Sequence, residues 1–283
     1  MSHPALFPDA VAVITGGASG IGLAAARAFA ARGLRVCIAD LGAERLEQAL
    51  AAIAAGATSR DAVMAVETDV ARRQDLVALE KVVRDRFGGT DVLMNNAGIG
   101  PASTTLGPLP DWERILGVNL WGVVHGTQAF VPGMLERARP GLIINTGSKQ
   151  GITTPPGNPA YNVSKAGVKA FTESLQHELR NMPGARLAAH LLVPGFVFTG
   201  LTARGGTDKP AGAWTAEQTV TFMLERVEAG DFYILCPDGE TTRALDERRI
   251  LWAAGDLVDN RPPLSRWHPD YAEAFAAFAR KQG

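Results

Sequence analysis

The sequence has little cysteine and no long apolar run. Its two cysteines, Cys37 and Cys236, both lie in apolar segments typical of strands. Buried thiols are therefore favoured over a disulfide or a metal site, and a reducing cytoplasm is the expected compartment. No apolar run approaches the roughly 20 residues that a membrane-spanning helix needs, and residues 1–10 lack the basic start of a targeting segment. We therefore expect a cytoplasmic protein that does not associate with a membrane.

The sequence also lacks an excess of either charge. Its histidines are not spaced as metal ligands usually are. The chain has 28 Lys and Arg residues against 29 Asp and Glu residues, a formal net charge of −1. Nucleic-acid binding is not expected, because it usually requires a basic excess or stripe. The 5 histidines show no ligand spacing, so no metal site is expected. With 283 residues, of which 46% are hydrophobic, the chain can form one large α/β domain.

What the sequence does contain is a tyrosine and a lysine separated by one helical turn. Tyr161 and Lys165 would project from the same face of a helix. A phenol with a pKa of roughly 10 exchanges protons poorly at neutral pH unless a nearby cation stabilises its anion, and Lys165 would lower that pKa. Ser148 follows the apolar run 142–144, at a predicted strand end where open α/β sheets bind ligands. The three residues indicate a proton-transfer site.

A glycine-rich turn stands between a predicted strand and a predicted helix near the N-terminus. The apolar run 11–14 leads to Gly16, Gly20 and Gly22, and an alanine-rich helical stretch follows. Glycines permit a tight turn and a close backbone approach to a pyrophosphate, which the first amides of the helix would bind. Asp40 ends the next predicted strand and could accept hydrogen bonds from an adenosine ribose. The turn and the carboxylate together predict a dinucleotide site.

Predicted strands and helices alternate along most of the chain. This order predicts right-handed crossovers and a single Rossmann-type, doubly wound parallel sheet of about seven strands with helices on both faces. The predicted strands are 11–15, 35–40, 63–68, 91–95, 141–147, 187–193 and 232–236. The predicted helices are 18–32, 43–55, 72–87, 111–137, 159–181 and 215–229.

Further motifs follow in a fixed order along the chain. They are the turn 15–22, Asp69 after a strand, the run Asn95-Asn96-Ala97-Gly98, Asn119, Ser148, Tyr161 with Lys165, and Pro194-Gly195 followed by Thr199. In this order the chain resembles the short-chain dehydrogenase/reductase family over roughly residues 8–240. The resemblance implies a catalytic tetrad of Asn119, Ser148, Tyr161 and Lys165. It also implies hydride transfer between a secondary alcohol and a nicotinamide cofactor, with Tyr161 as acid and base.

The expected cofactor is NAD, and the expected substrate is a small apolar molecule. The carboxylate of Asp40 would repel the 2′-phosphate of NADP, and Ser19 stands where NADP-using relatives often carry a basic residue. A hydrophobic or aromatic secondary alcohol or ketone suits a pocket without an obvious charge. Expected cofactor contacts are Gly16, Ser19, Gly20, Ile21, Gly22, Asp40, Asp69, Val70, Asn96, Ala97, Gly98, Tyr161, Lys165, Pro194, Gly195, Val197 and Thr199. Expected substrate contacts are Ser148, Gln150, Ile152, Phe196, Leu201 and Trp214.

The chain departs from the family pattern after its last predicted strand. It lacks the paired glycine common there and continues as an aromatic-rich extension, 240–283. We expect this extension to pack against the substrate pocket or a subunit interface, because disorder accompanies low hydrophobicity. The charged run 246–249 is expected to be a solvated helix face, and the glycine-rich segment 196–214 a mobile substrate loop. The whole chain, 1–283, is expected to be one NAD-binding Rossmann domain.

Quaternary structure and reaction type each leave alternatives. The extension puts the tail-mediated tetramer of the family in doubt, and we expect a homodimer or homotetramer formed through the helices that carry Asn119 and Tyr161. A 3-oxoacyl thioester reductase is a second reading, in which Arg204 or Lys209 could meet a carrier phosphate. A redox-neutral lyase or epimerase on the same fold is a third. A catalytically silent dinucleotide-binding protein would have no reason to keep the four tetrad residues together.

Overall fold

A parallel sheet forms the centre of the protein. The computed structural model describes residues 3–203, 208–239 and 241–280. Its seven-stranded sheet has the order β3-β2-β1-β4-β5-β6-β7, and every neighbouring pair is parallel, which confirms the predicted fold class. The strands are β1 (Val11–Thr15), β2 (Arg35–Asp40), β3 (Val63–Glu67), β4 (Val92–Asn95), β5 (Gly141–Thr146), β6 (Leu187–Val193) and β7 (Tyr233–Leu235).

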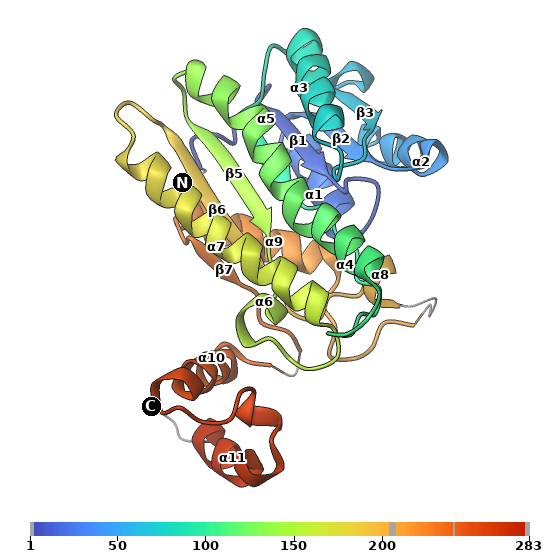
Figure 1. The fold of residues 1–283 in the computed structure, drawn as a ribbon. Helices are drawn as coiled ribbons and strands as arrows, with labels where there is room; N and C mark the ends of the chain where they lie inside the picture. Colours follow the sequence, from blue (N-terminus) through green and yellow to red (C-terminus); the bar gives the residue numbers. More distant parts are fainter. Residues whose placement is uncertain (1–2, 204–207, 240, 281–283) are drawn as a thin grey trace.

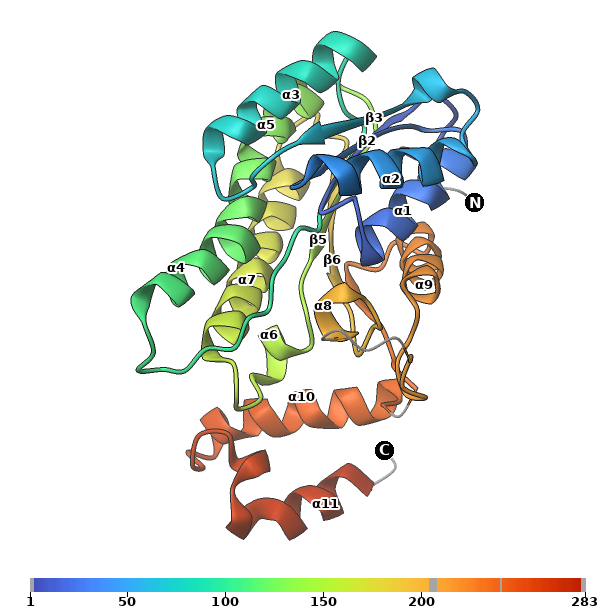
Figure 2. The same cartoon turned by 90° about the vertical axis from the view of Figure 1, so that its right-hand side faces the viewer.

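Helices cover both faces of this sheet (Figure 1). Neighbouring residues of β1 show why: Ala12 and Ile14 belong to the core on one face, and Val11 and Val13 to the core on the other. An uninterrupted apolar run is what a strand buried on both faces requires. Figure 2 shows the sheet between the two groups of helices. One group is α1 (Gly20–Ala31), α2 (Ala43–Ala54) and α9 (Ala216–Glu228), and the other is α3 (Arg73–Phe87), α5 (Gly122–Glu136) and α7 (Pro159–Asn181).

A chain of buried amides and hydroxyls fixes the elements that lead to the functional residues. Asn95, the last residue of β4, donates from Nδ2 to Oδ1 of Asn145 at 2.9 Å. Asn145 of β5 donates from Nδ2 to Oγ1 of Thr172 on α7 at 3.1 Å. Asn95 and Asn145 are at most 1% exposed, so these bonds have little competition from water. β4, β5 and α7 are thereby held in one mutual register.

The helix expected over 111–137 is interrupted. The structure has α4 (Leu109–Leu116), a π-helical segment η2 (Gly117–Trp121) and then α5. Asn119, at the centre of η2, is fully buried and makes two bonds to the backbone of Ile99: Nδ2 donates to the carbonyl at 2.9 Å, and Oδ1 accepts from the amide at 2.8 Å. A π-bulge is a helical turn that contains one extra residue, and such bulges are frequent at functional sites. This bulge accompanies the inward placement of the Asn119 side chain.

The C-terminal extension is folded and has a small core of its own. Trp252 is 6% exposed, and its ring centroid lies 5.4 Å from that of Phe275 and 5.3 Å from that of Phe278. Its indole Nε1 donates to Oγ of Ser265 at 2.8 Å, and the guanidinium of Arg261 lies 4.1 Å from its centroid. The elements of the extension are α10 (Arg243–Val258), η3 (Ser265–Trp267), η4 (Pro269–Tyr271) and α11 (Ala272–Arg280).

The expectation that 246–249 is a solvated face is wrong for its first residue. Asp246 is 4% exposed, and its Oδ2 lies 2.6 Å from Nζ of Lys149. Sequence patterning could not show this, because the partner is far away along the chain. α10 therefore touches the main body through a buried ion pair and through α6 (Gln150–Thr153), beneath which it lies in Figure 2.

Several short elements were not predicted. They are η1 (Arg60–Ala62), α6 and α8 (Gly200–Ala203), each of which is a single turn too short to show a periodic pattern. Within the described residues no helix is both long enough and apolar enough to cross a membrane.

Ending the chain after Gly255 should loosen α10. The truncation removes Ser265, Phe275 and Phe278, the neighbours that cover Trp252. Local unfolding of α10 should become at least about tenfold more populated, equivalent to ~1.4 kcal/mol. Trypsin cleavage after the arginines of α10, followed by mass spectrometry, measures this change. Leu257→Ala is the matched control, because Leu257 is 84% exposed on the same helix. Equal cleavage of truncated and full-length protein would contradict the expectation.

Candidate active site

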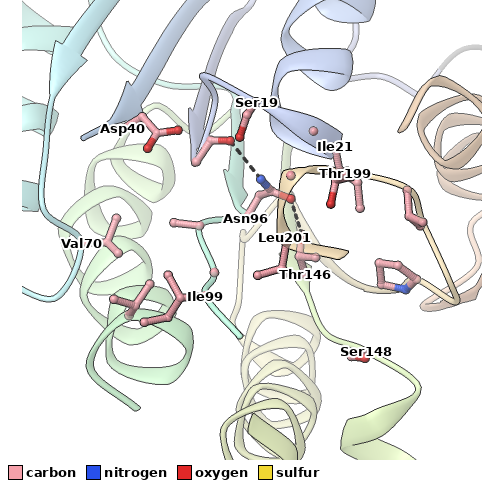
Figure 3. A pocket seen from close by; sticks show the side chains of 18 of the residues that line it. Ser19, Ile21, Asp40, Val70, Asn96, Ile99, Thr146, Ser148, Thr199 and Leu201 are labelled. Atoms are coloured by element: carbon pink, nitrogen blue, oxygen red, sulfur yellow. Dashed lines mark hydrogen bonds between the residues drawn. The ribbon is translucent and has the colours of Figure 1, made fainter. Parts of the chain in front are cut away.

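The main cavity lies at the carboxyl ends of the strands, where the strand order reverses between β1 and β4. This is the position at which open α/β sheets bind ligands. The cavity has a volume of about 310 Å³ and is lined by the segments that follow six of the strands. Figure 3 shows Asp40 and Ser148 at opposite ends of it. Every expected cofactor contact except Gly22 lines this cavity.

The glycine turn brings bare backbone to the wall of the cavity. Gly16 and Gly20 have φ values of +65° and +51°, which side-chain-bearing residues rarely adopt. Gly22 points away from the cavity and packs against the carbonyl of Gly16, where a Cβ would collide. Ser19 precedes α1, but its side chain makes no capping hydrogen bond. The first amides of α1 are therefore not capped by this side chain, which fits the needs of a pyrophosphate.

Asp40 ends β2 at the adenosine end expected for a dinucleotide. Its Oδ2 accepts from the amide of Ala18 at 3.0 Å, and its Oδ1 accepts from the amide of Leu41 at 2.8 Å. These bonds fix the carboxylate at the cavity wall. Sequence reasoning missed Arg45, which lines the same end and donates from Nη2 to the carbonyl of Leu41 at 2.7 Å. Its position in the first turn of the helix after Asp40 was the available signal.

Asn96 joins three strand ends below the cavity. Its amide donates to Oγ1 of Thr15 at 3.0 Å, and its Nδ2 donates to the carbonyl of Thr15 at 3.2 Å. Oγ1 of Thr146 donates to its Oδ1 at 3.2 Å, a bond marked in Figure 3. Asn96 thus connects β1, β4 and β5. Thr146 was not predicted to take part, although it directly precedes the Gly147-Ser148 pair.

Tyr161 and Lys165 project from α7 to the other end of the cavity, where Ser148 lies. Burial raises the pKa of the Tyr161 phenol, and a hydrogen bond with Ser148 opposes this rise. Burial lowers the pKa of the Lys165 amine to about 8. Its Nζ donates to the carbonyl of Thr146 at 2.8 Å and lies 5.8 Å from the centre of the Tyr161 ring.

The expected effect of Lys165 on Tyr161 therefore does not dominate in this structure. We expected Lys165 to lower the pKa of the phenol, whereas burial moves that pKa upward. The reason is that desolvation penalises both the phenolate and the ammonium. Lys165 is 4% exposed, and this burial lowers the pKa of its amine to about 8.

Asn119 lies behind this pair rather than in the cavity wall. A Cβ on Gly98 would lie 3.5 Å from Oδ1 of Asn119 and 3.7 Å from Nζ of Lys165, so both side chains border the same glycine. Nδ2 of Asn119 also donates to Oγ of Ser164 at 3.2 Å. The four residues of the expected tetrad are thus gathered at one end of the site.

The segment after β6 forms the opposite wall. Pro194, Gly195, Val197 and Thr199 line the cavity, and Gly20 lies so close that a Cβ there would be 3.1 Å from Cγ2 of Thr199. The segment therefore closes against the glycine turn.

The expected substrate residues do not all reach the cavity. Ser148 and Leu201 line it, whereas Gln150, Ile152, Phe196 and Trp214 do not. Gln150 is exposed and Phe196 is 41% exposed. Ile152 faces a smaller cavity beside α10, and the Trp214 ring packs 5.7 Å from that of Phe222. Side-chain direction in the single-turn helix α6 and in the loop after β6, which the sequence does not give, decides these placements.

Of the two basic residues considered for a carrier phosphate, the structure describes only Lys209. Arg204 lies outside the described residues, as do the glycines at 205 and 206. Lys209 donates from Nζ to the carbonyl of Ala213 at 2.8 Å. In the part of the chain that the structure describes, no group of three or more His, Cys, Asp or Glu residues is arranged to hold a metal ion.

Known proteins with a similar sequence share most of this chain. Residues 10–210 match the short chain dehydrogenase family. A 1-deoxy-11-beta-hydroxypentalenate dehydrogenase of Streptomyces exfoliatus is 33% identical over 90% of this chain and 93% of its own length. A 2-(R)-hydroxypropyl-CoM dehydrogenase of Xanthobacter autotrophicus is 36% identical over 68% of this chain and 76% of its own.

A solved structure agrees with these matches. A short chain dehydrogenase/reductase of Burkholderia phymatum, crystallised in complex with NAD, superposes with a TM-score of 0.81 at 32% identity. The superposition covers 91% of this chain and 97% of the other. The strand order, the matched segment and these relatives together show that this chain belongs to the short-chain dehydrogenase/reductase family.

Proposed function

We propose that the protein is an NAD-dependent oxidoreductase that interconverts a hydrophobic or aromatic secondary alcohol and its ketone. The observation that carries the proposal is the meeting of Tyr161, Ser148 and Lys165 at one end of a cavity whose other end holds Asp40. Two relatives are named as dehydrogenases of hydroxylated compounds, and NAD is bound in a similar structure. In this proposal residues 1–283 form one dinucleotide-binding unit with a substrate loop, 196–214, and an extension, 240–283.

The lining of the cavity fits an extended dinucleotide. Asp40 would accept hydrogen bonds from the adenosine ribose, and Asp69 and Val70 would border the adenine. The amides at the start of α1 would bind the pyrophosphate. Pro194 and Thr199 would border the nicotinamide, beside Tyr161 and Lys165.

Proton transfer would be the task of Tyr161. When bound, NAD supplies the acceptor for the hydride that leaves the alcohol carbon. In oxidation Tyr161 takes the hydroxyl proton while the carbon–oxygen single bond of the alcohol becomes the double bond of the ketone. In reduction Tyr161 returns that proton to the oxygen. Ser148 donates a hydrogen bond to the substrate oxygen. The products of oxidation are a ketone, the reduced cofactor and one proton.

Lys165 would hold the cofactor ribose and carry the proton onward. Its Nζ already donates to the carbonyl of Thr146, which fixes its direction. Asn119 borders the same glycine as Lys165 and would support a water that relays the proton. An amine whose pKa is about 8 can both release and accept a proton near neutral pH.

An apolar substrate is favoured by Leu201. A Cβ on Gly100 would lie 3.3 Å from Cδ1 of Leu201 and 3.8 Å from Cε2 of Tyr161, so these three residues converge. The alkyl side chain would cover a hydrophobic substrate at the phenol. Among the described residues, Lys209 is bonded to its own loop and so gives no support to a phosphate-bearing thioester.

We further propose that the protein is a homodimer or homotetramer. Trp121 is 51% exposed and Val163 is 48% exposed, and they lie on the helices next to Asn119 and Tyr161. Large apolar side chains exposed on adjacent helices are typical of subunit interfaces.

Tyr161→Phe should lower kcat by at least about 10²-fold, because the phenol is the acid and base. The ring remains, so binding of NAD should stay within about twofold of the wild-type value. Steady-state kinetics on a panel of secondary alcohols and ketones, with NAD titrated by fluorescence, measures both. A Tyr161→Phe enzyme with near wild-type turnover would contradict the mechanism. A wild-type reaction without net change in NADH absorbance would indicate a lyase or epimerase.

The enzyme should prefer NAD to NADP because Asp40 would repel a 2′-phosphate. Asp40→Ala should raise kcat/KM with NADP by at least about tenfold, since Arg45 would then be the main charge at that end, and Ser19→Arg should add to the gain. Initial rates with both cofactors test this. Equal or better kcat/KM with NADP in the wild-type protein would refute the preference.

Lys165 should make the free protein more stable as pH rises. Its pKa is about 8 when folded and about 10.5 when unfolded, so between these values the unfolded chain binds more protons. The free energy of unfolding should therefore gain about 1 kcal/mol between pH 8 and pH 9 from this residue. Urea unfolding of wild type and Lys165→Met at both pH values isolates the effect, because other groups contribute equally to both proteins. The same pH dependence in both proteins would contradict the assignment.

A further inference from the structure

A buried cluster of charges lies directly beside the catalytic strand end. Lys149 follows Ser148, and its Nζ lies 3.1 Å from Oδ2 of Asp238 and 2.6 Å from Oδ2 of Asp246. The side chains of Lys149, Asp238 and Asp246 are 16%, 12% and 5% exposed. The three residues come from three separate segments: the connection between β5 and α6, the turn after β7 and helix α10.

Asp238 extends the cluster to the wall of the cofactor cavity. Its Oδ2 also accepts from the amide of Phe196 at 3.2 Å, and a Cβ on Gly195 would lie 3.1 Å from its Cβ. Lys149 donates from its own amide to the carbonyl of Pro194 at 3.4 Å. The cluster therefore holds the segment 194–196, which lines the cavity, against the residue that follows Ser148.

Asp246 ties the cluster to the C-terminal extension. It lies in the first turn of α10, whose cap Thr242 accepts from the amide of Leu245 at 3.2 Å. Arg249, one turn further along, donates from Nη1 to Oγ1 of Thr241 at 3.1 Å. The amide of Thr241 in turn donates to Oδ1 of Asp238 at 3.0 Å. Through these polar contacts the extension is connected both to the segment 194–196 and to Lys149, which follows Ser148.

Stability alone is a poor reason for such a cluster. Burying charges is costly, and replacing a buried ion pair with well-packed apolar residues is often neutral or stabilising. What the cluster supplies is a defined geometry, because the carboxylate of Asp238 accepts hydrogen bonds at particular angles from Lys149, Phe196 and Thr241, and Asp246 adds a second charge contact to the same ammonium. Here the geometry concerns Ser148 and the segment 194–196, between which the substrate oxygen and the nicotinamide would meet.

We infer that Lys149, Asp238 and Asp246 are positioning residues, through which the C-terminal extension holds Ser148 and the segment 194–196 at the separation that hydride transfer needs. The inference rests on the proposed function. None of the three lines the cofactor cavity, so they act through their neighbours rather than on the reacting atoms. A misplacement of about 1 Å at a reacting centre can lower a rate by about 10²-fold.

The test compares Lys149→Met and Asp246→Asn with wild type and with Lys149→Arg. The first two should lower kcat by about tenfold while KM changes less than about threefold, and Lys149→Arg should retain most of the activity. Binding of ADP-ribose, which lacks the nicotinamide, should be unchanged, because the adenosine end is remote from the cluster. Deuterium exchange of the backbone amides at 147–151 and 195–198 should quicken in Lys149→Met and Asp246→Asn.

Asp91→Asn is the matched control for the loss of a buried ion pair. Asp91 is 1% exposed and 2.7 Å from Nε of Arg139, at the amino end of the strands, away from the cavity. Asp91→Asn should lower thermal stability without changing kcat or the amide exchange at 147–151 and 195–198. If Lys149→Met behaved like this control, the positioning role would be overturned. A wild-type protein without turnover on any alcohol or ketone would count against the proposed function alone, because the exchange measurement decides the positioning role without substrate.

Discussion

The parallel pairing of β1 with both β2 and β4 is the contact on which the active site depends. Chain order reverses at β1, so the connections on its two sides leave in opposite directions and open a cavity between them. Asn96 then converts this arrangement into a rigid floor, since its amide and side chain bond to Thr15 and Thr146 on the two flanking strands. These bonds add to the strand pairing in fixing the separation of the glycine turn and the Ser148 segment.

Burial sets the chemistry of the catalytic end. Desolvation moves the pKa of Tyr161 up and that of Lys165 down to about 8, so both groups tend toward their neutral forms in the free protein. A bound cofactor with a positively charged nicotinamide would favour the phenolate by charge. Both groups lie in a nearly dry site, where the hydrogen bond between Tyr161 and Ser148 and the bond from Lys165 to the Thr146 carbonyl fix the directions of the two side chains.

The sequence was sufficient for the sheet because every strand is a short apolar run that ends at a turn. It was also sufficient to bring Gly16, Asp40, Ser148 and Tyr161 to one cavity, because carboxyl ends of parallel strands share an edge. It failed where direction depends on distant partners. Ile152 faces a smaller cavity beside α10, and the Trp214 ring packs against Phe222. Asp246 is buried against Lys149, and Asn119 lies in a π-bulge that no periodic pattern predicts.

The extension contacts the segments beside the active site without lining the cavity. Its own core, centred on Trp252, gives α10 a fixed shape, and that shape presents Asp246 to Lys149. An extension that merely covered apolar surface would need no charge at this contact, and a flexible one would not offset the cost of burying Asp246. The small core around Trp252 and the buried ion pair between Asp246 and Lys149 therefore favour an extension that positions active-site segments over one that only covers apolar surface.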